Sequence, residues 1–442
     1  MSFESLGLAP ALVRALAERN YTTPTPIQAE AIPHILAGHD LLGGAQTGTG
    51  KTAAFVLPML QRLNDKPGHS DRRPRALILV PTRELAVQVH DSIRAYSKFQ
   101  RLNTTVIYGG AGMTPQMDAL RRGVDILVAT PGRLIDHLER RTADLSAVEM
   151  LVLDEADRML DMGFLPAIKR VLNKLPSNRQ TLLFSATFED ALKKLALEFL
   201  RNPKEVQIAA RNTVAPNVTH RVHPVDAVRK RDLLVEILSQ RWQDQILVFG
   251  KTKHGCNRLS EQLEKAGISS VAIHGNKSQA QRLKALRDFK SGQARVLVAT
   301  DVAARGLDIP LLPLVINFDL PMVAEDYVHR IGRTGRAGAS GEAISLVSPD
   351  EGQLLRAIHR VLKADIEVVE VEGFTPTRGI RMGNDNASNG RPSGQRPPSR
   401  VRRPHANNGP RHAHAGAKSP NERSERGGGE RRSVVNAPRN PR

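Results

Sequence analysis

Short apolar runs alternate with helical patterns twice over along this chain of 442 residues. Each run has the length of a buried strand, and the stretches between runs have the period of helices, for example at 82–98 and 278–291. Such alternation is typical of parallel sheets whose strands are joined by helices. The pattern predicts an α/β fold with two parallel sheets. The expected strands are 40–43, 76–80, 104–108, 126–129, 150–153 and 180–184 in the first half, and 218–225, 246–249, 270–273, 296–299, 314–317 and 342–347 in the second.

The length predicts more than one domain, because 442 residues are too many for one ordinary hydrophobic core. The stretch AARNTVAP at 209–216 has no apolar period and ends in proline, so it is the expected interdomain linker. The predicted organisation is a first domain at 1–208, a linker at 209–217, a second domain at 218–373 and a tail at 374–442.

The composition changes abruptly at the start of this tail. Residues 374–442 contain 15 Lys plus Arg against 4 Asp plus Glu, and no aromatic residue follows Phe374. A segment with so few apolar residues buries too little surface to offset its ordering entropy, so we expect a disordered basic tail. His405, His412 and His414 form a candidate metal-binding tract, but without cysteines or a fixed framework a solvated tail is favoured.

The formal net charge of +19 indicates a polyanionic partner, either nucleic acid or an anionic membrane face. No apolar run reaches the roughly 18 residues that span a bilayer, and the first residues lack the pattern of a signal peptide. Nucleic acid is therefore favoured, with no membrane partner. The single cysteine, Cys256, fits a reducing cytoplasm, so a cytoplasmic location is expected. A catalytic thiol is one interpretation of Cys256, and a buried position on a helix is the favoured one.

The segment AQTGTGKT at 45–52 lies between an expected strand and an expected helix. Glycines at Gly48 and Gly50 let backbone N–H groups approach a phosphate at a helix N-terminus. Lys51 is then expected to reach the β and γ phosphates, and Thr52 to ligate Mg2+. Alanine replaces the usual first glycine of the Walker pattern, which weakens the bare motif. The expected nucleotide-binding residues of this loop are Ala45, Gln46, Thr47, Gly48, Thr49, Gly50, Lys51 and Thr52.

A second motif, DEAD at 154–157, directly follows the apolar run 150–153. This position places Asp154 and Glu155 at the carboxyl edge of a parallel sheet, where ligands bind in open α/β folds. Asp154 is the expected Mg2+ ligand, through water, because Mg2+ keeps part of its hydration shell. Glu155 is expected to polarise the attacking water, and Asp157 to tie the motif to its neighbours.

Two further motifs are SAT at 185–187 and HRIGRTGR at 329–336. The cations of the second repel one another unless an anion faces them, and guanidinium groups suit a triphosphate. With PTPIQ at 24–28, these motifs in this order resemble the DEAD-box family of ATP-dependent RNA helicases. Members of that family also have alanine where this chain has Ala45. The resemblance covers residues 3–347.

The resemblance implies two tandem RecA-like domains around a cleft that binds ATP and Mg2+. It also implies that Gln28 reads the adenine edge and that Phe3 stacks on the base. Arg333 and Arg336 are the implied arginine fingers, a device that typically contributes ~10³–10⁵ in rate, and Asp308 lies near the ribose. The implied catalytic residues are Lys51, Glu155, Arg333 and Arg336. The implied coupling residues are Ser185, Thr187, His329 and Arg330.

The same resemblance implies a track that holds an RNA backbone. Its hydroxyls, glycine amides and loop-end arginines suit contacts to phosphate and sugar, which carry no sequence information. The expected partner is therefore structured or duplex RNA, bound without sequence preference. The implied RNA contacts are Pro81, Thr82, Arg83, Gly109, Gly110, Thr130, Pro131, Gly132 and Arg133 in the first domain, and Gln279, Arg282, Thr300, Arg305 and Gly306 in the second.

A finer likeness concerns the segments DLLGGAQTGTGKTA and HGNKSQAQR, which are similar to the bacterial RhlE-type branch of the family. That branch is associated with ribosome assembly and RNA turnover. Ribosomal precursors or RNA-decay proteins are accordingly the partners expected through the tail.

Two alternative functions remain open. A DNA-tracking helicase or translocase of the same superfamily commonly carries a DExH box and a glutamine-led final motif, whereas this chain has DEAD and a motif led by His329. A non-enzymatic RNA clamp or chaperone is the other alternative, and the intact Lys51, Thr52, Asp154 and Glu155 speak against it. The ATPase rate without nucleic acid, with single-stranded DNA and with RNA separates the three functions.

Overall fold

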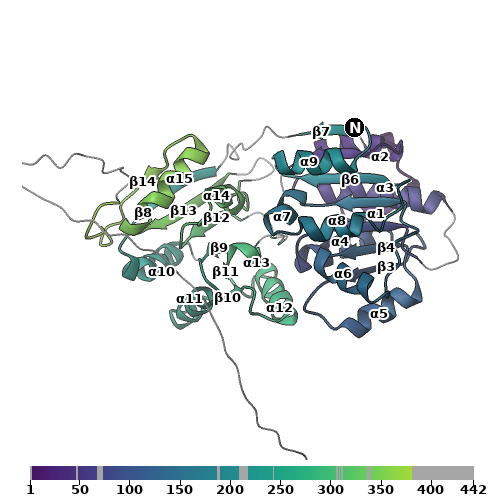
Figure 1. Ribbon diagram of the computed structural model, residues 1–442. Coiled ribbons are helices and arrows are strands. Elements are labelled where there is room, and N and C mark those ends of the chain that lie inside the picture. Colours follow the sequence, from purple (N-terminus) through teal and green to yellow (C-terminus); the bar gives the residue numbers. More distant parts are fainter. Residues whose placement is uncertain are drawn as a thin grey trace, which may run out of the picture. The chain divides into compact units, whose positions relative to one another are not determined.

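The computed structural model of the chain describes residues 2–45, 48–66, 73–186, 190–208, 218–241, 243–304, 307, 309, 312–335 and 340–380. The predicted linker at 209–217 and the tail from residue 381 onward lie outside these residues. Within the described ranges, the chain forms two parallel sheets with helices between successive strands (Figure 1). The α/β fold with two RecA-like parallel sheets is thereby confirmed.

The first sheet has the strand order β3-β4-β2-β5-β6-β1-β7, and every pair is parallel. Its strands are β1 (Leu41–Gly44), β2 (Ala76–Leu79), β3 (Thr104–Ile107), β4 (Ile126–Ala129), β5 (Met150–Leu153), β6 (Gln180–Ser185) and β7 (Lys204–Gln207). The helices are η1 (Glu4–Leu6), α1 (Pro10–Ala17), α2 (Pro26–Leu36), α3 (Lys51–Asp65), α4 (Arg83–Tyr96), α5 (Met113–Arg122), α6 (Pro131–Glu139), α7 (Ala156–Asp161), α8 (Leu165–Leu172) and α9 (Asp190–Phe199).

The second sheet repeats this topology in the order β10-β11-β9-β12-β13-β8-β14, again with parallel pairs. Its strands are β8 (Val218–Pro224), β9 (Ile246–Phe249), β10 (Ser270–Ile273), β11 (Val296–Ala299), β12 (Leu314–Asn317), β13 (Gly341–Val347) and β14 (Glu367–Val368). The helices are η2 (Ala227–Arg229), α10 (Lys230–Gln240), α11 (Lys253–Lys265), α12 (Gln279–Lys290), α13 (Asp301–Ala304), α14 (Ala324–Ile331), η3 (Pro349–Glu351) and α15 (Gly352–Leu362).

Alternate residues of the central strands face two different hydrophobic cores. In β5, Met150 and Val152 join the core on one face of the first sheet, while Leu151 and Leu153 join the core on the other. Successive side chains of a strand point to opposite faces, so a strand covered by helices on both sides is apolar along most of its length. This is the physical reason that the apolar runs located the strands in the sequence.

Two edge strands, β7 and β14, were missing from the sequence-based prediction. The side chains of β7 are exposed except for Val206, and both residues of β14 are exposed. An edge strand with one buried side chain, or none, contains no apolar run. The prediction therefore failed only where backbone hydrogen bonds, rather than burial, hold the strand.

The single cysteine, Cys256, is fully buried on α11, in the core of the second sheet. Burial raises the pKa of its thiol to about 12, with Asp319 adding to the shift. A thiol with so high a pKa stays protonated at neutral pH, which disfavours nucleophilic chemistry. The expectation of a buried helical position for Cys256 is confirmed.

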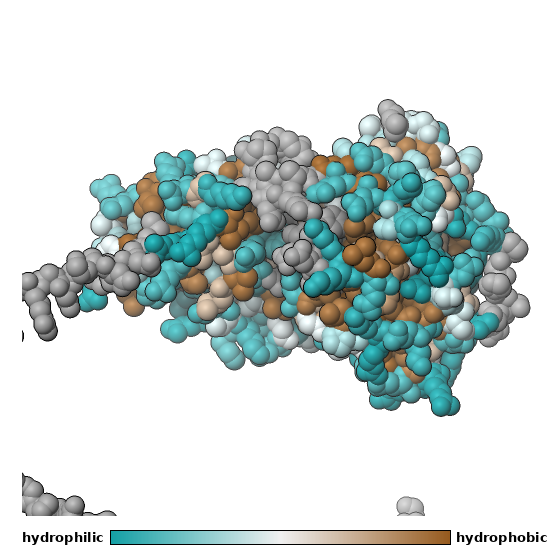
Figure 2. Space-filling view, turned by 45° about the horizontal axis from the view of Figure 1, so that its top comes forward, coloured by the Kyte–Doolittle hydropathy of each residue, from teal (hydrophilic) through white to brown (hydrophobic). Residues whose placement is uncertain are grey.

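The surface of the described residues is largely hydrophilic on the face drawn in Figure 2, with apolar areas interspersed. Among all described residues, on any face, the exposed large apolar side chains are Tyr21, Leu165, Leu197, Val228, Val302, Met322, Val323 and Val368. No helix in the described part of the chain is long and apolar enough to cross a membrane.

Residues just beyond β14 still contact the second sheet's domain. The Phe374 ring lies 4.6 Å from the Arg229 guanidinium, and Thr377 donates its backbone N–H to Asp226 at 3.1 Å. Ile380 packs against the core formed by β8, β13, α14 and α15. The predicted start of the tail at residue 374 stays a prediction, and these contacts make a second cut, after Ile380, informative in a truncation experiment.

Candidate functional site

The strand order of the first sheet brings three predicted motifs together. The loops at 45–52, 154–157 and 185–187 follow β1, β5 and β6, which are neighbours in the order β5-β6-β1. Parallel strands end at the same edge, so these loops share one end of the sheet. The predicted RNA contacts follow β2, β3 and β4, which are neighbours in the order β3-β4-β2. The carboxyl ends of the strands therefore carry both sets of motifs. The predicted ATP-site motifs follow β5, β6 and β1, and the predicted RNA contacts follow β3, β4 and β2.

The loop after β1 has the backbone geometry of a phosphate cradle. Gly48 and Gly50 have φ of +83° and +93°, a region that glycine adopts without steric cost. Lys51 begins helix α3, is buried, and donates its Nζ to the Ala45 carbonyl at 2.6 Å. This bond holds the Lys51 ammonium group against the loop at 45–52. Gln46 and Thr47 lie outside the described residues.

Gln28 ties this loop to the N-terminus of α2. Its Oε1 accepts the Thr25 backbone N–H at 2.9 Å, and its Nε2 donates to the Gly50 carbonyl at 3.1 Å. A Cβ atom added at Gly50 would lie only 2.3 Å from Gln28 Nε2, so this close approach requires glycine. An amide has two N–H groups and two lone pairs on oxygen, so Gln28 keeps capacity for a ligand.

Asp154 is 2% exposed, at the end of β5. Its backbone N–H donates to the Leu79 carbonyl at 3.0 Å, and its Oδ1 accepts the Glu155 N–H at 2.9 Å. Burial raises the pKa of Asp154 to about 7, the Glu155 charge adds to the rise, and the Lys51 ammonium opposes it. A carboxylate in this environment gains from a nearby cation, because the cation favours its ionised form.

Glu155 follows in a left-handed conformation, with φ of +51°. Such a conformation is uncommon for a residue other than glycine and concentrates at functional sites. Its Oε2 accepts from Arg158 Nη1 at 2.8 Å, and both side chains are buried. Burial alone would raise the pKa of Glu155, but Arg158 and Lys51 outweigh it, so the pKa is lowered and the carboxylate is ionised.

Asp157 connects the second motif to the third. Its Oδ2 accepts the Ala186 backbone N–H at 3.0 Å, in agreement with the expectation that Asp157 ties DEAD to its neighbours. Ser185 is fully buried, and its carbonyl accepts the Ala45 N–H at 3.1 Å. The SAT motif therefore contacts both the acidic motif and the phosphate cradle. Thr187 lies outside the described residues.

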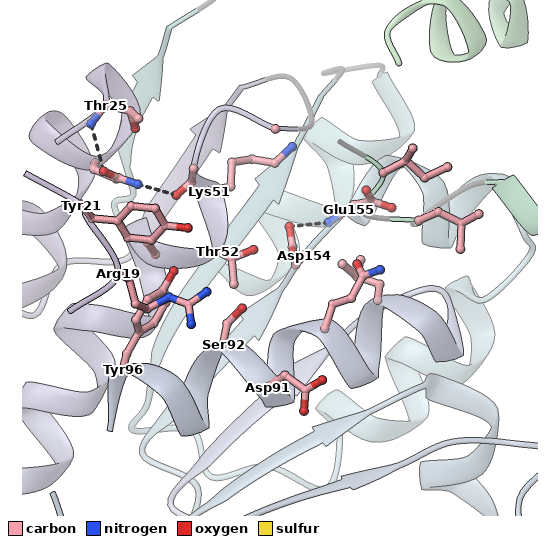
Figure 3. A pocket seen from close by; sticks show the side chains of 18 of the residues that line it. Arg19, Tyr21, Thr25, Lys51, Thr52, Asp91, Ser92, Tyr96, Asp154 and Glu155 are labelled. Atoms are coloured by element: carbon pink, nitrogen blue, oxygen red, sulfur yellow. Dashed lines mark hydrogen bonds between the residues drawn. The ribbon is translucent and has the colours of Figure 1, made fainter. Parts of the chain in front are cut away.

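These groups line a cavity of about 690 Å³ (Figure 3). Lys51, Thr52, Asp154 and Glu155 lie toward one part of it, and Arg19, Tyr21 and Tyr96 gather in another. The described lining residues from the first half are Phe3, Arg19, Tyr21, Thr23, Thr25, Gln28, Gly48, Gly50, Lys51, Thr52, Ala53, Leu85, Gln88, Asp91, Ser92, Tyr96, Asp154 and Glu155, and those from the second half are Lys290, Leu307, Ile309 and Arg333.

The polar face of helix α4 lines this cavity, and the sequence analysis did not identify it. Gln88, Ser92 and Tyr96 are spaced four residues apart, which places them on one face of the helix. The Arg19 guanidinium lies 5.8 Å from the Tyr21 ring and 5.9 Å from the Tyr96 ring. The four-residue spacing was a usable signal, whereas nothing in the sequence placed Arg19 beside it.

The two candidate base-stacking rings differ in exposure. Phe3 is 3% exposed and belongs to the core of the first sheet, although it also lines the cavity. Tyr21 is 44% exposed and lines the same cavity. A ring that stacks on a base needs an accessible face, which Tyr21 offers and Phe3 scarcely does.

The arginine strip of the second half begins at the end of α14. Arg330 is buried and bonds to Asp301, Asn317 and Asp319, all in the second half. The coupling role expected for Arg330 and His329 stays a prediction, since these bonds of Arg330 are all made within its own half of the chain. Arg333 donates to the Leu307 carbonyl at 2.9 Å and lines the main cavity. Arg336 and Asp308 lie outside the described residues.

The predicted RNA contacts of the first half form one cluster of loops. The Arg83 guanidinium lies over the Gly109–Gly110 turn, since a Cβ at Gly110 would be 2.1 Å from its Nη1. Arg133 donates to the Ala111 carbonyl at 3.0 Å, in the same loop. Thr82 and Thr130 are the N-cap residues of α4 and α6, Pro81 precedes the first cap, and Pro131 and Gly132 begin α6.

The predicted RNA contacts of the second half are engaged differently. Arg282 pairs with the buried Glu84 at 2.8 Å, and Gln279 donates to the same carboxylate at 3.1 Å. In the described structure these side chains therefore bond to the first half of the chain. Thr300 follows β11, and Arg305 and Gly306 lie outside the described residues.

A phosphate cradle after β1 and an acidic pair after β5, which β6 separates from β1 in the sheet, define a P-loop nucleotide-binding protein. Residues 25–195 match the DEAD/DEAH box helicase model, and residues 229–338 match the helicase conserved C-terminal domain model. The chain is 44% identical over 366 residues to the DEAD-box ATP-dependent RNA helicase CshA of Bacillus cereus, covering 83% of this chain and 69% of that protein. It is 46% identical over 371 residues to the ATP-dependent RNA helicase DeaD of Escherichia coli, covering 84% and 58%.

Solved structures agree with this likeness. Saccharomyces cerevisiae Dbp5 bound to RNA and ADP BeF3 matches with a TM-score of 0.74 and 33% identity, covering 85% of this chain and 95% of that one. A DEAD box protein from Methanococcus jannaschii matches with a TM-score of 0.51 and 38% identity, covering 84% and 99%. The chain belongs to the DEAD-box helicase family.

Proposed function

We propose that this protein is an ATP-dependent RNA helicase, an RNA-stimulated ATP hydrolase that locally unwinds short duplexes. The observation that carries the proposal is a single cavity that collects Gly48, Gly50, Lys51, the Asp154–Glu155 pair and Arg333. A phosphate cradle, an acidic pair and an arginine are the parts that phosphoryl transfer to water requires. The CshA and DeaD relatives carry the same activity in their names.

Each part has a role that its environment supports. The N–H groups of the cradle and the Lys51 ammonium bind phosphate oxygens. Glu155, ionised and held by Arg158 at 2.8 Å, orients water and accepts its proton. Arg333, and by family likeness Arg336, would stabilise charge on the transferred group. Lys51, Glu155 and the two arginines are therefore the proposed catalytic residues.

The residues present also fit Mg2+, although the described residues contain no cluster of three or more His, Cys, Asp or Glu side chains that would hold a metal alone. Asp154 is a buried carboxylate with a raised pKa, and Thr52 lines the same cavity with its hydroxyl group. Two oxygen groups suffice for Mg2+, because water and substrate phosphates complete its octahedron. Bound there, Mg2+ would neutralise phosphate charge, while Asp154 and Thr52 fix its position.

At the other end of the cavity we propose that Tyr21, rather than Phe3, stacks on the adenine. The exposure of the two rings supports this assignment, since Phe3 is packed in the core. Gln28 supplies the polar contact to the base edge while its bonds to Thr25 and Gly50 hold it in place. Through the bond to Gly50, binding of a base at Gln28 would affect the conformation of the phosphate-binding loop.

The nucleic-acid dependence of ATP hydrolysis tests the proposed function. RNA is expected to raise the rate by at least about tenfold over protein alone, and single-stranded DNA by less, because the arginine and glycine track is proposed to accept an RNA backbone. Equal stimulation by DNA would instead support the DNA-tracking alternative. The absence of hydrolysis under every condition would support the non-enzymatic clamp.

The cellular role is a further part of this proposal. A process in ribosome assembly or RNA turnover, in the cytoplasm, follows from the likeness to the RhlE-type branch. Ribosomal precursors or RNA-decay proteins are the proposed partners of the tail. Crosslinking in cells, followed by sequencing of the bound RNA, checks this role. Enrichment of ribosomal RNA precursors or of messenger RNA fragments would support it.

The basic tail is expected to strengthen RNA binding without altering catalysis. Its charge is positive and it has no aromatic residue after Phe374, so its contacts should be electrostatic, each phosphate adding ~0.7 to the log–log salt slope for single strands. Truncation after Ile380 should leave the maximal RNA-stimulated ATPase rate unchanged, raise the RNA concentration for half-stimulation and flatten the salt dependence.

A second truncation, after Gly373, serves as the matched comparison. It also removes the contacts of Phe374 with Arg229 and of Thr377 with Asp226. If only this shorter protein loses thermal stability, the folded domain extends to residue 380. If the protein truncated after Ile380 loses its ATPase activity at saturating RNA, the tail belongs to the catalytic machinery and the prediction is wrong.

A further inference from the structure

Three neighbouring strands of the second sheet form a buried platform beneath α14. Asn317, the last residue of β12, is paired in register with Phe249 of β9 and with Ser345 of β13. Asn317 and Ser345 are 0% exposed, and Phe249 is buried as well. Phe249, Asn317 and Ser345 therefore present an aromatic ring, an amide and a hydroxyl group side by side at one level of the sheet.

Arg330 rests on this platform. Its guanidinium lies 4.8 Å from the centre of the Phe249 ring, and its Nη1 donates to Asn317 Oδ1 at 3.0 Å and to the Asp319 carbonyl at 2.7 Å. Nε and Nη2 donate to the two carboxylate oxygens of Asp301, at 2.5 and 2.8 Å. With four N–H bonds and a stacked face, the guanidinium has one well-defined position.

The orientation of the Asn317 amide depends on Ser345. Asn317 Nδ2 donates to Ser345 Oγ at 3.1 Å, which leaves Oδ1 facing Arg330. A flipped amide would bring its N–H groups against those of the guanidinium, donor against donor. The Ser345 hydroxyl also bonds to the Tyr327 hydroxyl, which lies 3.1 Å from His220 Nδ1. Hydrogen bonds thus connect Arg330, Asn317, Ser345, Tyr327 and His220 in series, with Arg330 donating to Asn317 and Asn317 donating to Ser345.

This chain of hydrogen bonds anchors α14 at two points one turn apart, Tyr327 and Arg330. Arg333 follows one turn later, and its backbone N–H donates to the Arg330 carbonyl at 3.2 Å. Arg333 reaches the cavity that also contains Lys51 and Glu155. A displacement of the Arg330 guanidinium would therefore shift the backbone from which the catalytic arginine extends.

We propose that Asn317 is a positioning residue for ATP hydrolysis: with its orientation set by Ser345, it seats Arg330 and thereby aims Arg333 at the phosphate cavity. The proposal rests on the proposed ATPase function. It does not give Asn317 any contact with substrate. Its effect should fall on the step in which the arginine acts, so kcat should change far more than the KM for ATP.

The test compares variants of Asn317 and Ser345 in the full chain, at saturating RNA. Asn317→Leu keeps the size of the side chain but removes the acceptor for Arg330, and should lower kcat by ~10–100-fold, the effect of losing a hydrogen bond to a charged group. Asn317→Asp restores an acceptor, and should recover most of the lost rate. Ser345→Ala frees the amide to flip, and should give an intermediate loss in kcat.

A matched control is Ser260→Ala. Ser260 is a buried serine of the same half, bonded to Ser270 Oγ at 3.0 Å and remote from Arg330 in the fold, so its loss should leave kcat unchanged. Thermal melting and KM for ATP are measured for every variant. Parental kcat in Asn317→Leu, or equal losses in Asn317→Leu and Asn317→Asp that track melting temperature, would overturn the proposal. A parent without RNA-stimulated hydrolysis would instead overturn the proposed function, which separates the two failures.

Discussion

Replacing Glu155 by glutamine is expected to lower kcat for ATP hydrolysis by about 10³-fold while ATP binding changes little. The amide keeps an oxygen that accepts from Arg158, so the local structure is retained, but it does not take a proton from water. The ATP-bound complex should then persist on RNA. Steady-state ATPase rates at saturating RNA, with equilibrium binding of a fluorescent ATP analogue, measure both effects.

The matched control is Glu149→Gln, the same chemical change in the same half of the chain. Glu149 pairs with Arg75 at 2.7 Å, at the start of β5 and thus at the opposite end of that strand from Asp154. Its substitution should leave kcat unchanged. Hydrolysis by the Glu155 variant within a few-fold of the parent would remove Glu155 from its proposed role as the group that activates water.

Replacing Arg333 by alanine is expected to lower kcat by ~10³-fold or more, the typical contribution of an arginine finger. Arg333→Lys should recover little of this rate, because an ammonium group does not reproduce the two parallel N–H bonds of a guanidinium to phosphate. Equilibrium ATP binding should weaken far less than kcat, since the group acts on charge that develops in the transition state. Single-turnover hydrolysis at saturating RNA measures the chemical step.

Arg360→Ala is the control for this experiment. Arg360 is an exposed arginine on α15, outside the cavity lining, and its loss should leave the single-turnover rate unchanged. If the Arg333 variants keep the parental rate while the Arg360 control behaves as expected, Arg333 does not act on the transferred phosphate. Arg336 would then be the remaining candidate among the arginines of the strip.

The accuracy of the strand prediction has a simple physical basis. Parallel strands covered on both faces are apolar at most positions, and all twelve expected runs correspond to strands of the two sheets. The two missed strands, Lys204–Gln207 and Glu367–Val368, are edge strands with mostly exposed side chains. Their pairing is carried by backbone groups, which every sequence contains, so no pattern of side chains marked them.

The candidate site likewise contains some residues that the sequence identified and others that it did not. Gly48, Gly50, Asp154 and Glu155 were identifiable because their function requires particular residue types at close sequence spacing. Arg19 and Tyr96 were not identified, because their meeting in the cavity depends on how α1 and α4 pack, over a sequence separation that no motif spans. Phe3 was predicted as the stacking ring, and only its burial revealed how little of its face is accessible.

The sequence by itself determined the two parallel sheets, the phosphate cradle and the acidic pair, because hydrophobic period and backbone geometry are local properties. Tertiary structure decided which donors meet which acceptors. Gln28 donates to the Gly50 carbonyl, and both residues line the cavity. Arg330 contacts Phe249 and Asn317 because β9 and β12 are neighbours in the sheet. A buried polar group must find its partner among the residues that strand order places beside it, and that order is a property of the whole fold.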